Sequence, residues 1–152
     1  MCAMPVLQNS PFKIELNEWG NIAMNPASNL HGCLQTEIAF WLKTANQSGK
    51  VLTECSVQTG KGAKVADVAW GSNDFFGKNA MKTPFQVAPE VCVKIVLPSN
   101  SKAEIQEKTT LYLAKGAKEV WICDETGKVK FYGYEGEKAS SGLFANAPVN
   151  LE

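Results

Sequence analysis

The chain has 152 residues, of which 45% are hydrophobic and 20% are charged, values typical of a soluble globular protein and outside the disordered and fibrous classes. Its formal net charge is zero, because 15 lysines balance 15 acidic residues and the chain contains no arginine. No overall positive field therefore attracts nucleic acid, and any nucleic-acid site must be local.

The cysteines and the N-terminal region bear on the cellular compartment. The cysteine number is odd and the spacing is wide, so neither a disulfide framework nor a paired CxxC metal site fits. We expect reduced, buried thiols in a cytoplasmic protein. The N-terminal region lacks the features of a secretion signal, and no stretch approaches the roughly 20 apolar residues that span a bilayer. The cysteines are Cys2, Cys33, Cys55, Cys92 and Cys123.

The first third of the chain predicts a hairpin and a long helix. Apolar residues in 12–16 and 21–24 flank a Gly-containing turn, which is typical of two paired strands. From Ser28 onward, apolar residues recur at steps of three and four, which indicates an amphipathic helix ending near Ser48-Gly49. The apolar stripe of this helix consists of Leu30, Leu34, Ile38, Trp41 and Ala45.

A second hairpin and a buried strand follow. The runs 51–57 and 65–70 flank a Gly-rich turn and favour a hairpin. Residues 71–84 are polar and contain glycine, so we expect an irregular or short helical segment. The run 91–97 is apolar almost throughout, which is typical of a strand buried on both faces.

The ends of the next helix are well marked. Ser101 and Glu104 form a capping-box pattern that starts a helix running to Lys115, with Gly116 just beyond its end. The order strand, helix, strand favours a right-handed crossover onto a mixed sheet flanked by helices. The prediction is one α/β domain, 1–152. The remaining elements are strands 119–123 and 128–132 and a loosely packed end, 136–152, and residues 1–11 and 138–152 are expected to be peripheral.

Two charged residues interrupt apolar strands. Asp67 lies within 65–70, and Lys94 lies within 91–97. An unpaired buried ion costs several kcal/mol, so each must face solvent, bind a metal or pair with its opposite. One interpretation turns both outward on edge strands. The other places them face to face on neighbouring strands near the sheet centre.

Further candidates lie on the two long helices. Lys108 and Tyr112 share one helix face with Lys115 and are suited to a phosphate. The alternative is a solvated face, because Glu104 stands four residues before Lys108 in the favourable order for an ion pair. His31, the only histidine, follows the cap of the first helix; it is a candidate for substrate binding, although a solvated first-turn histidine is the commoner outcome.

Several segments resemble, in order and spacing, the Uma2 family of restriction-endonuclease-like proteins. The most specific part is the turn Pro98-Ser99-Asn100 followed by Lys108, Tyr112, Gly116 and Glu119-Val120-Trp121, and the resemblance extends from about Phe12 to Leu151. The segments are Asn17-Glu18-Trp19-Gly20, His31 at the head of a helix, VADVAWGS, PEVCVKIVLPSNS, EIQEKTTLYLAKGAKEVWICD and KVKFYG.

This resemblance implies a restriction-endonuclease-like α/β core of the PD-(D/E)xK superfamily and Mg²⁺-dependent hydrolysis of DNA. Asp67 matches the metal-binding aspartate, and Lys108 matches a lysine that has moved to the helix. Lys94, however, stands at the family's glutamate position, and Leu97 replaces a usual serine. An ammonium in place of a carboxylate changes the local charge by two units, so we expect weak or absent Mg²⁺ binding and impaired cleavage.

The leading hypothesis is therefore an impaired DNA endonuclease with catalytic candidates Asp67, Lys94, Lys108 and Tyr112, and with Glu18, His31 and Gln35 at the substrate-binding rim. The alternative is a catalytically silent nucleic-acid-binding or protein-interaction module. We also expect the Lys94 ammonium to settle beside the Asp67 carboxylate. A homodimer is a weaker prediction, based on aromatic residues in expected surface segments, although these residues are equally suited to fill the core. They are Trp19, Phe75 and Phe76.

Overall fold

The computed structural model describes residues 12–16, 22–26, 28–45 and 48–151. Predictions about Cys2, Glu18, Trp19 and the segment 1–11 lie outside these residues. Within the described part, no helix is long and apolar enough to cross a membrane. The predicted early hairpin is present: β1 (Phe12–Leu16) pairs antiparallel with β2 (Ile22–Pro26).

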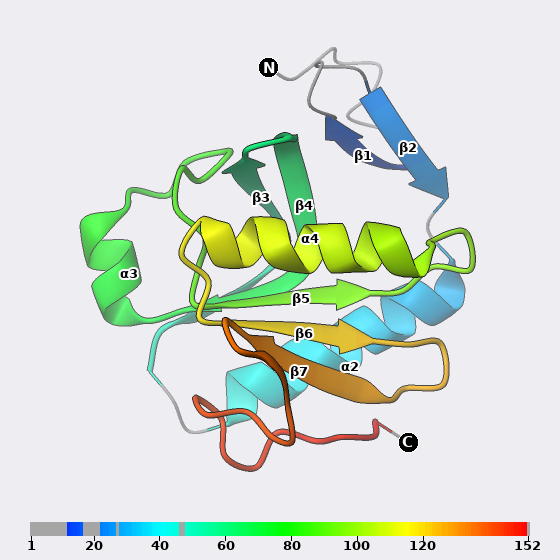
Figure 1. Ribbon diagram of the computed structural model, residues 1–152. Coiled ribbons are helices and arrows are strands. Elements are labelled where there is room, and N and C mark those ends of the chain that lie inside the picture. The colour runs from blue at the N-terminus through cyan, green and yellow to red at the C-terminus, as the bar shows by residue number, and fades with distance from the viewer. Residues whose placement is uncertain (1–11, 17–21, 27, 46–47, 152) are drawn as a thin grey trace.

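A mixed sheet of six strands forms the centre of the molecule, in the order β3-β4-β5-β6-β7-β8 (Figure 1). β5 and β6 are parallel, and the other neighbours are antiparallel. The prediction of a mixed α/β sheet is confirmed, and β4 and β5 are interior neighbours. The strands are β3 (Lys50–Thr59), β4 (Gly62–Gly71), β5 (Val91–Ile95), β6 (Glu119–Cys123), β7 (Val129–Gly133) and β8 (Gly136–Lys138).

Helices cover both faces of this sheet. α2 (Asn29–Thr44) packs with one hydrophobic cluster and α4 (Lys102–Ala114) with another, and Figure 1 shows them on opposite sides of the strands. The short helix α3 (Asn73–Lys78) lies in the segment 71–84, for which we expected an irregular or short helical structure. The capping box of α4 is present, and Gly116 has the positive φ of 110° that glycine adopts without strain.

The aromatic residues of α3 correct one premise of the dimer prediction. Phe75 is buried and packs edge-on against Phe76 and Phe85, and Phe76 is partly buried in the same cluster. These rings fill the core between α3 and the sheet, because adjacent aromatic side chains bury large apolar areas together. They provide no exposed aromatic patch for a partner.

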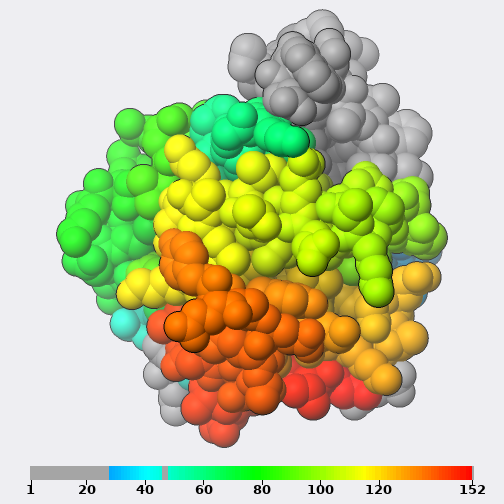
Figure 2. All heavy atoms as spheres, in the orientation of Figure 1, coloured from blue at the N-terminus to red at the C-terminus, as the bar shows by residue number. Residues whose placement is uncertain are grey.

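The C-terminal segment is packed more tightly than its small residues predicted. Phe144 is 2% exposed and contacts the rings of Trp41, Trp70 and Trp121. Figure 2 shows the last strands and the C-terminal segment, coloured orange to red, on the surface of the molecule next to α4. The expectation of a loosely packed end is therefore wrong here, because a buried ring and several polar contacts hold this segment to the sheet.

Three of the cysteines confirm the expectation of buried, reduced thiols. Cys55, Cys92 and Cys123 are buried and free, whereas Cys33 is free but exposed. Burial raises the pKa of Cys55 to about 12 and, together with the nearby Asp124, raises that of Cys123 to about 11. These thiols stay protonated at neutral pH and act as small apolar core residues.

The candidate active site at Asp67

Asp67 lies where the pairing of β3 with β4 is interrupted. Ladder pairs join Thr53 to Val68 and Cys55 to Ala66, but the intervening pair of Glu54 and Asp67 is missing. Glu54 has a φ of 52°, which places it in the left-handed region. At this break in the ladder, the Asp67 side chain reaches the backbone of β5.

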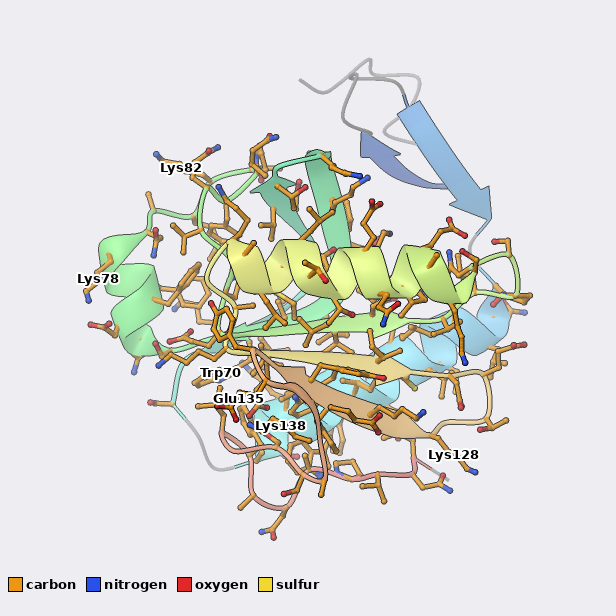
Figure 3. All side chains as sticks on the ribbon, viewed as in Figure 1. Trp70, Lys78, Lys82, Lys128, Glu135 and Lys138 are labelled. Atoms are coloured by element: carbon orange, nitrogen blue, oxygen red, sulfur yellow. The ribbon has the colours of Figure 1, made fainter. Side chains whose placement is uncertain are left out.

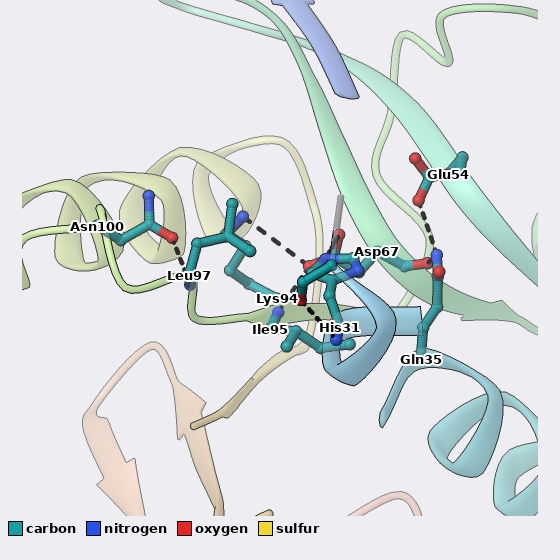
Figure 4. Close-up of polar contacts among 9 residues, drawn as sticks. His31, Gln35, Glu54, Asp67, Lys94, Ile95, Leu97 and Asn100 are labelled. Atoms are coloured by element: carbon teal, nitrogen blue, oxygen red, sulfur yellow. Dashed lines mark hydrogen bonds and ion pairs between the residues drawn. The ribbon is translucent and has the colours of Figure 1, made fainter. Parts of the chain in front are cut away.

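The Asp67 carboxylate is fully buried and receives contacts from two directions. Oδ2 accepts a hydrogen bond of 2.6 Å from the backbone N–H of Ile95, and Oδ1 lies 3.0 Å from Nε2 of His31. Figure 4 shows β5 and the first turn of α2 meeting at this carboxylate. Because an ionised carboxylate only accepts hydrogen bonds, Nε2 of His31 is the donor in this contact.

Lys94 completes the group. Its Nζ lies 3.9 Å from Oδ2 of Asp67, and the two side chains are 1% and 0% exposed. The prediction that the Lys94 ammonium settles beside Asp67 is confirmed. The interpretation that placed both charges outward on edge strands is wrong, because β4 and β5 are interior strands and the buried charges compensate each other.

His31 is placed by the start of α2. Its backbone N–H donates to the Ser28 side chain at 3.0 Å, which fixes the first helical turn over the sheet. The side chain is 6% exposed, so the expectation of a solvated first-turn histidine is wrong. The reason is tertiary: the helix start lies against β4, where the Asp67 carboxylate binds the imidazole.

Gln35, one turn further along α2, bridges the interrupted strands. Its Nε2 donates to the backbone carbonyl of Asp67 at 2.8 Å and to Oε2 of Glu54 at 2.7 Å. Glu54 was not identified from the sequence as a site residue. The run 51–57 also contains Thr53 and Ser56, so a carboxylate there is a weaker signal than Asp67 within its apolar strand.

Lys108 and Tyr112 lie on the adjoining helix α4. Tyr112 is fully buried in the cluster that includes Ala66 and Ala69 of β4, and Lys108 is half-buried one turn earlier. The burial of Tyr112 makes it a core residue, whereas Lys108 keeps part of its surface exposed to solvent. Glu104 accepts the Ser101 N–H at 2.8 Å within the capping box.

A small pocket of about 40 Å³ opens beside His31. Its walls come from the start of α2, the end of β5 with the following turn, and the β6–β7 turn. Leu97 is one of these walls, and its side chain makes the pocket more apolar than a serine at this position would. The lining residues are Ser28, Leu30, His31, Leu34, Ile95, Val96, Leu97, Pro98 and Glu125.

The residues around Asp67 do not fit a divalent cation. Mg²⁺ requires several oxygen ligands, but both Asp67 oxygens already accept contacts from donors, and the Lys94 ammonium lies within 4 Å. Among the described residues, no group of three or more His, Cys, Asp and Glu side chains is arranged to hold a metal ion. In this form the carboxylate is satisfied by the protein's own cation.

Comparison with known proteins agrees with this architecture. A crystal structure of a putative nuclease belonging to DUF820 from Anabaena variabilis has a similar fold, with a TM-score of 0.74 at 16% sequence identity, covering 91% of this chain and 87% of that chain. None of the curated proteins compared with the chain matches it. The model of the Uma2 family, described as "Putative restriction endonuclease", matches residues 1–141. Since that match spans most of the sequence, the chain belongs to the Uma2 family.

Proposed function

We propose that this chain carries the active site of a Mg²⁺-dependent DNA endonuclease in which Lys94 takes the position of a metal-binding glutamate. Hydrolysis is therefore abolished or weak. We call this arrangement, with the Lys94 ammonium beside the Asp67 carboxylate, the closed site. One observation carries the proposal. The Lys94 ammonium lies 3.9 Å from Oδ2 of Asp67, and both side chains are buried at the centre of the nuclease-like sheet.

The charge of the site supports this interpretation. Asp67 and Lys94 together carry no net charge, whereas a carboxylate at position 94 would give the pair two negative charges. Two adjacent carboxylates repel each other and favour a divalent cation between them. An ammonium in that place instead satisfies Asp67 and opposes the binding of a second cation.

The family and the fold support a nucleic-acid substrate for the same site. Lys108 is half-buried on α4, one turn before Tyr112, and it is our candidate for contact with a phosphate. Its neighbour Tyr112 is fully buried, so we assign it a packing role in this form. Figure 3 shows Lys78, Lys82 and Lys128 projecting outward at separate places, which fits local rather than global attraction of DNA.

The closed site also favours a second candidate, a catalytically silent module that binds nucleic acid. A salt titration of DNA binding by the unaltered chain tests this candidate. A steep fall in affinity with salt indicates contacts to phosphates, whereas absence of binding at every salt concentration indicates a protein partner.

The decisive test compares the chain with Lys94→Glu in a plasmid-cleavage assay with Mg²⁺ or Mn²⁺. We expect cleavage and calorimetric metal binding only in Lys94→Glu, and neither in Lys94→Glu combined with Asp67→Asn. Lys94→Met is the matched control, because it removes the ammonium without supplying a carboxylate. Equal metal affinity or equal cleavage by the unaltered chain and Lys94→Glu would contradict the proposal.

A homodimer remains a prediction for this protein, because cleavage of both DNA strands usually needs two sites. The burial of Phe75 and partial burial of Phe76 remove the aromatic argument for it in the described residues. Sedimentation at high protein concentration measures the association state, and a monomer there would contradict the prediction.

A further inference from the structure

The break between β3 and β4 is bridged by one side chain from α2. At the level of Glu54 and Asp67 the two strands lack a ladder pair, although pairing is regular on both sides. The Gln35 amide group has two hydrogens, and it donates to the Asp67 carbonyl and to the Glu54 carboxylate at 2.8 and 2.7 Å. Gln35 therefore ties the two strands together where their own pairing is missing.

We propose that Gln35 and Glu54 are positioning residues that hold the backbone of Asp67 so that its carboxylate stays on the Ile95 N–H and His31. The inference rests on the proposed function only for its effect on hydrolysis. It assigns Glu54 a role at the site through its hydrogen bond to Gln35, without contact to substrate or metal.

The conformation of Glu54 supports this role. Its φ of 52° is the only positive value at a non-glycine among the described residues, and side chains other than glycine reach this region at some cost. The Glu54 side chain is exposed, so packing in the core does not stabilise this left-handed backbone conformation. The hydrogen bond to Gln35 is the contact that favours it and directs the carboxylate toward α2.

The Asp67 carboxylate depends on this arrangement because its partners lie on different elements. The Ile95 N–H belongs to β5 and is 2.6 Å from Oδ2, whereas His31 belongs to α2 and is 3.0 Å from Oδ1. A shift of the Asp67 backbone cannot preserve both contacts. Gln35 lies one helical turn after His31, so the same helix fixes both the carbonyl and the carboxylate of Asp67 (Figure 4).

The test uses the unaltered chain as background and needs neither metal nor cleavage. Glu54→Gly keeps the positive φ and removes the carboxylate, Glu54→Gln keeps an acceptor oxygen, and Gln35→Leu removes the amide. Gln58→Leu is the matched control, because Gln58 is also on β3 and its amide donates to the neighbouring Thr59 carbonyl, at 3.4 Å, rather than across to β4. The readouts are the NMR shift and the hydrogen-exchange rate of the Ile95 amide, relative to Val93 in the same strand.

We expect Glu54→Gly and Gln35→Leu to move the Ile95 amide signal and to speed its exchange relative to Val93 by about tenfold or more. Glu54→Gln and the control should stay within about twofold of the unaltered chain. An unchanged Ile95 amide in folded Glu54→Gly would overturn the inference, as would a loss in Glu54→Gln equal to that in Glu54→Gly. If Gln35→Leu does not fold, Gln35→Asn replaces it, because a shorter amide cannot span both acceptors.

The consequence for hydrolysis is measured separately, in Lys94→Glu. Adding Glu54→Gly or Gln35→Leu there should lower kcat about 10- to 100-fold while the KM for DNA changes less, and Glu54→Gln should restore most of the loss. If Lys94→Glu itself does not cleave DNA, the proposed function fails, and the amide measurements on the unaltered chain still decide the positioning role.

Discussion

Two buried carboxylates in the same sheet, Asp67 on β4 and Glu119 on β6, are stabilised in different ways. Asp67 is 0% exposed and is held by a backbone N–H, an imidazole and a buried ammonium from separate elements. Glu119 is 2% exposed, and most of its donors come from one short C-terminal segment. The donors to Glu119 are Trp121 Nε1, Ser141 Oγ, the N–H groups of Gly142 and Leu143, and Lys138 Nζ, at 3.0, 2.6, 2.6, 3.2 and 3.0 Å.

This difference separates a structural carboxylate, Glu119, from the carboxylate of the candidate site, Asp67. Hydrogen bonds to Glu119 attach the C-terminal segment to the sheet, and its cation, Lys138, is 38% exposed. The site at Asp67 instead encloses a lysine that is 1% exposed, next to the only histidine of the chain. Burying a full ion pair is rarely needed for stability, and this agrees with the role that we propose for the pair in the candidate site.

The largest expected effect comes from removing one member of the Asp67 pair. Asp67→Leu leaves the Lys94 ammonium buried without its carboxylate, and we expect a loss of about 3–5 kcal/mol in the free energy of unfolding. The double variant Asp67→Leu with Lys94→Met should recover only the part of that loss that comes from the unpaired ammonium, because the Ile95 N–H and His31 still lack their acceptor. Urea denaturation measures both, and a double variant as unstable as the single one would contradict this account.

A smaller loss is expected at Glu119. Glu119→Gln keeps the shape of the side chain but removes the charge that its donors stabilise, and we expect a loss of about 2 kcal/mol. Lys138→Met is the control, with an expected loss below about 1 kcal/mol because the partly exposed ammonium remains partly hydrated in the native state. Glu119→Leu combined with Lys138→Met should recover less than the Asp67 double variant, because Lys138 is already partly exposed and the N–H groups of Gly142 and Leu143 still lose their acceptor.

The smallest expected effect is a decrease, at low pH, in the stability that the Glu119 carboxylate contributes. Burial raises the pKa of Glu119, but hydrogen bonds from Ser141, Trp121 and Lys138 outweigh it, so the pKa lies below its usual value of 4.5. A carboxylate with a lowered folded pKa contributes stability that is fully present above the unfolded pKa and is lost as pH falls through the folded pKa. The stability gap between the unaltered chain and Glu119→Gln should therefore narrow below pH 4.5. A gap that stays constant in urea denaturations from neutral pH into this range would contradict the assignment.

Local sequence patterns predicted much of the scaffold. The capping box predicts where α4 begins, and Gly116 predicts where it ends. Both are readable in the sequence because these residues lie within one turn of the helix ends. The burial of β5 follows from an apolar run that only a central strand accommodates. The charge within that run, at Lys94, and the matching charge at Asp67 identified the site because an isolated buried ion is costly wherever the strand lies.

Only the tertiary structure decided how the site is assembled. The sequence contains no local sign that His31 binds Asp67 or that Gln35 bridges Asp67 and Glu54, because these contacts join residues 19 to 36 positions apart. The role of Glu119 was equally hidden, since its donors Ser141 and Gly142 lie 22 and 23 residues further along the chain. Periodicity and capping report on neighbours in sequence, whereas the partners of a buried carboxylate are set by how helices and strands pack around it.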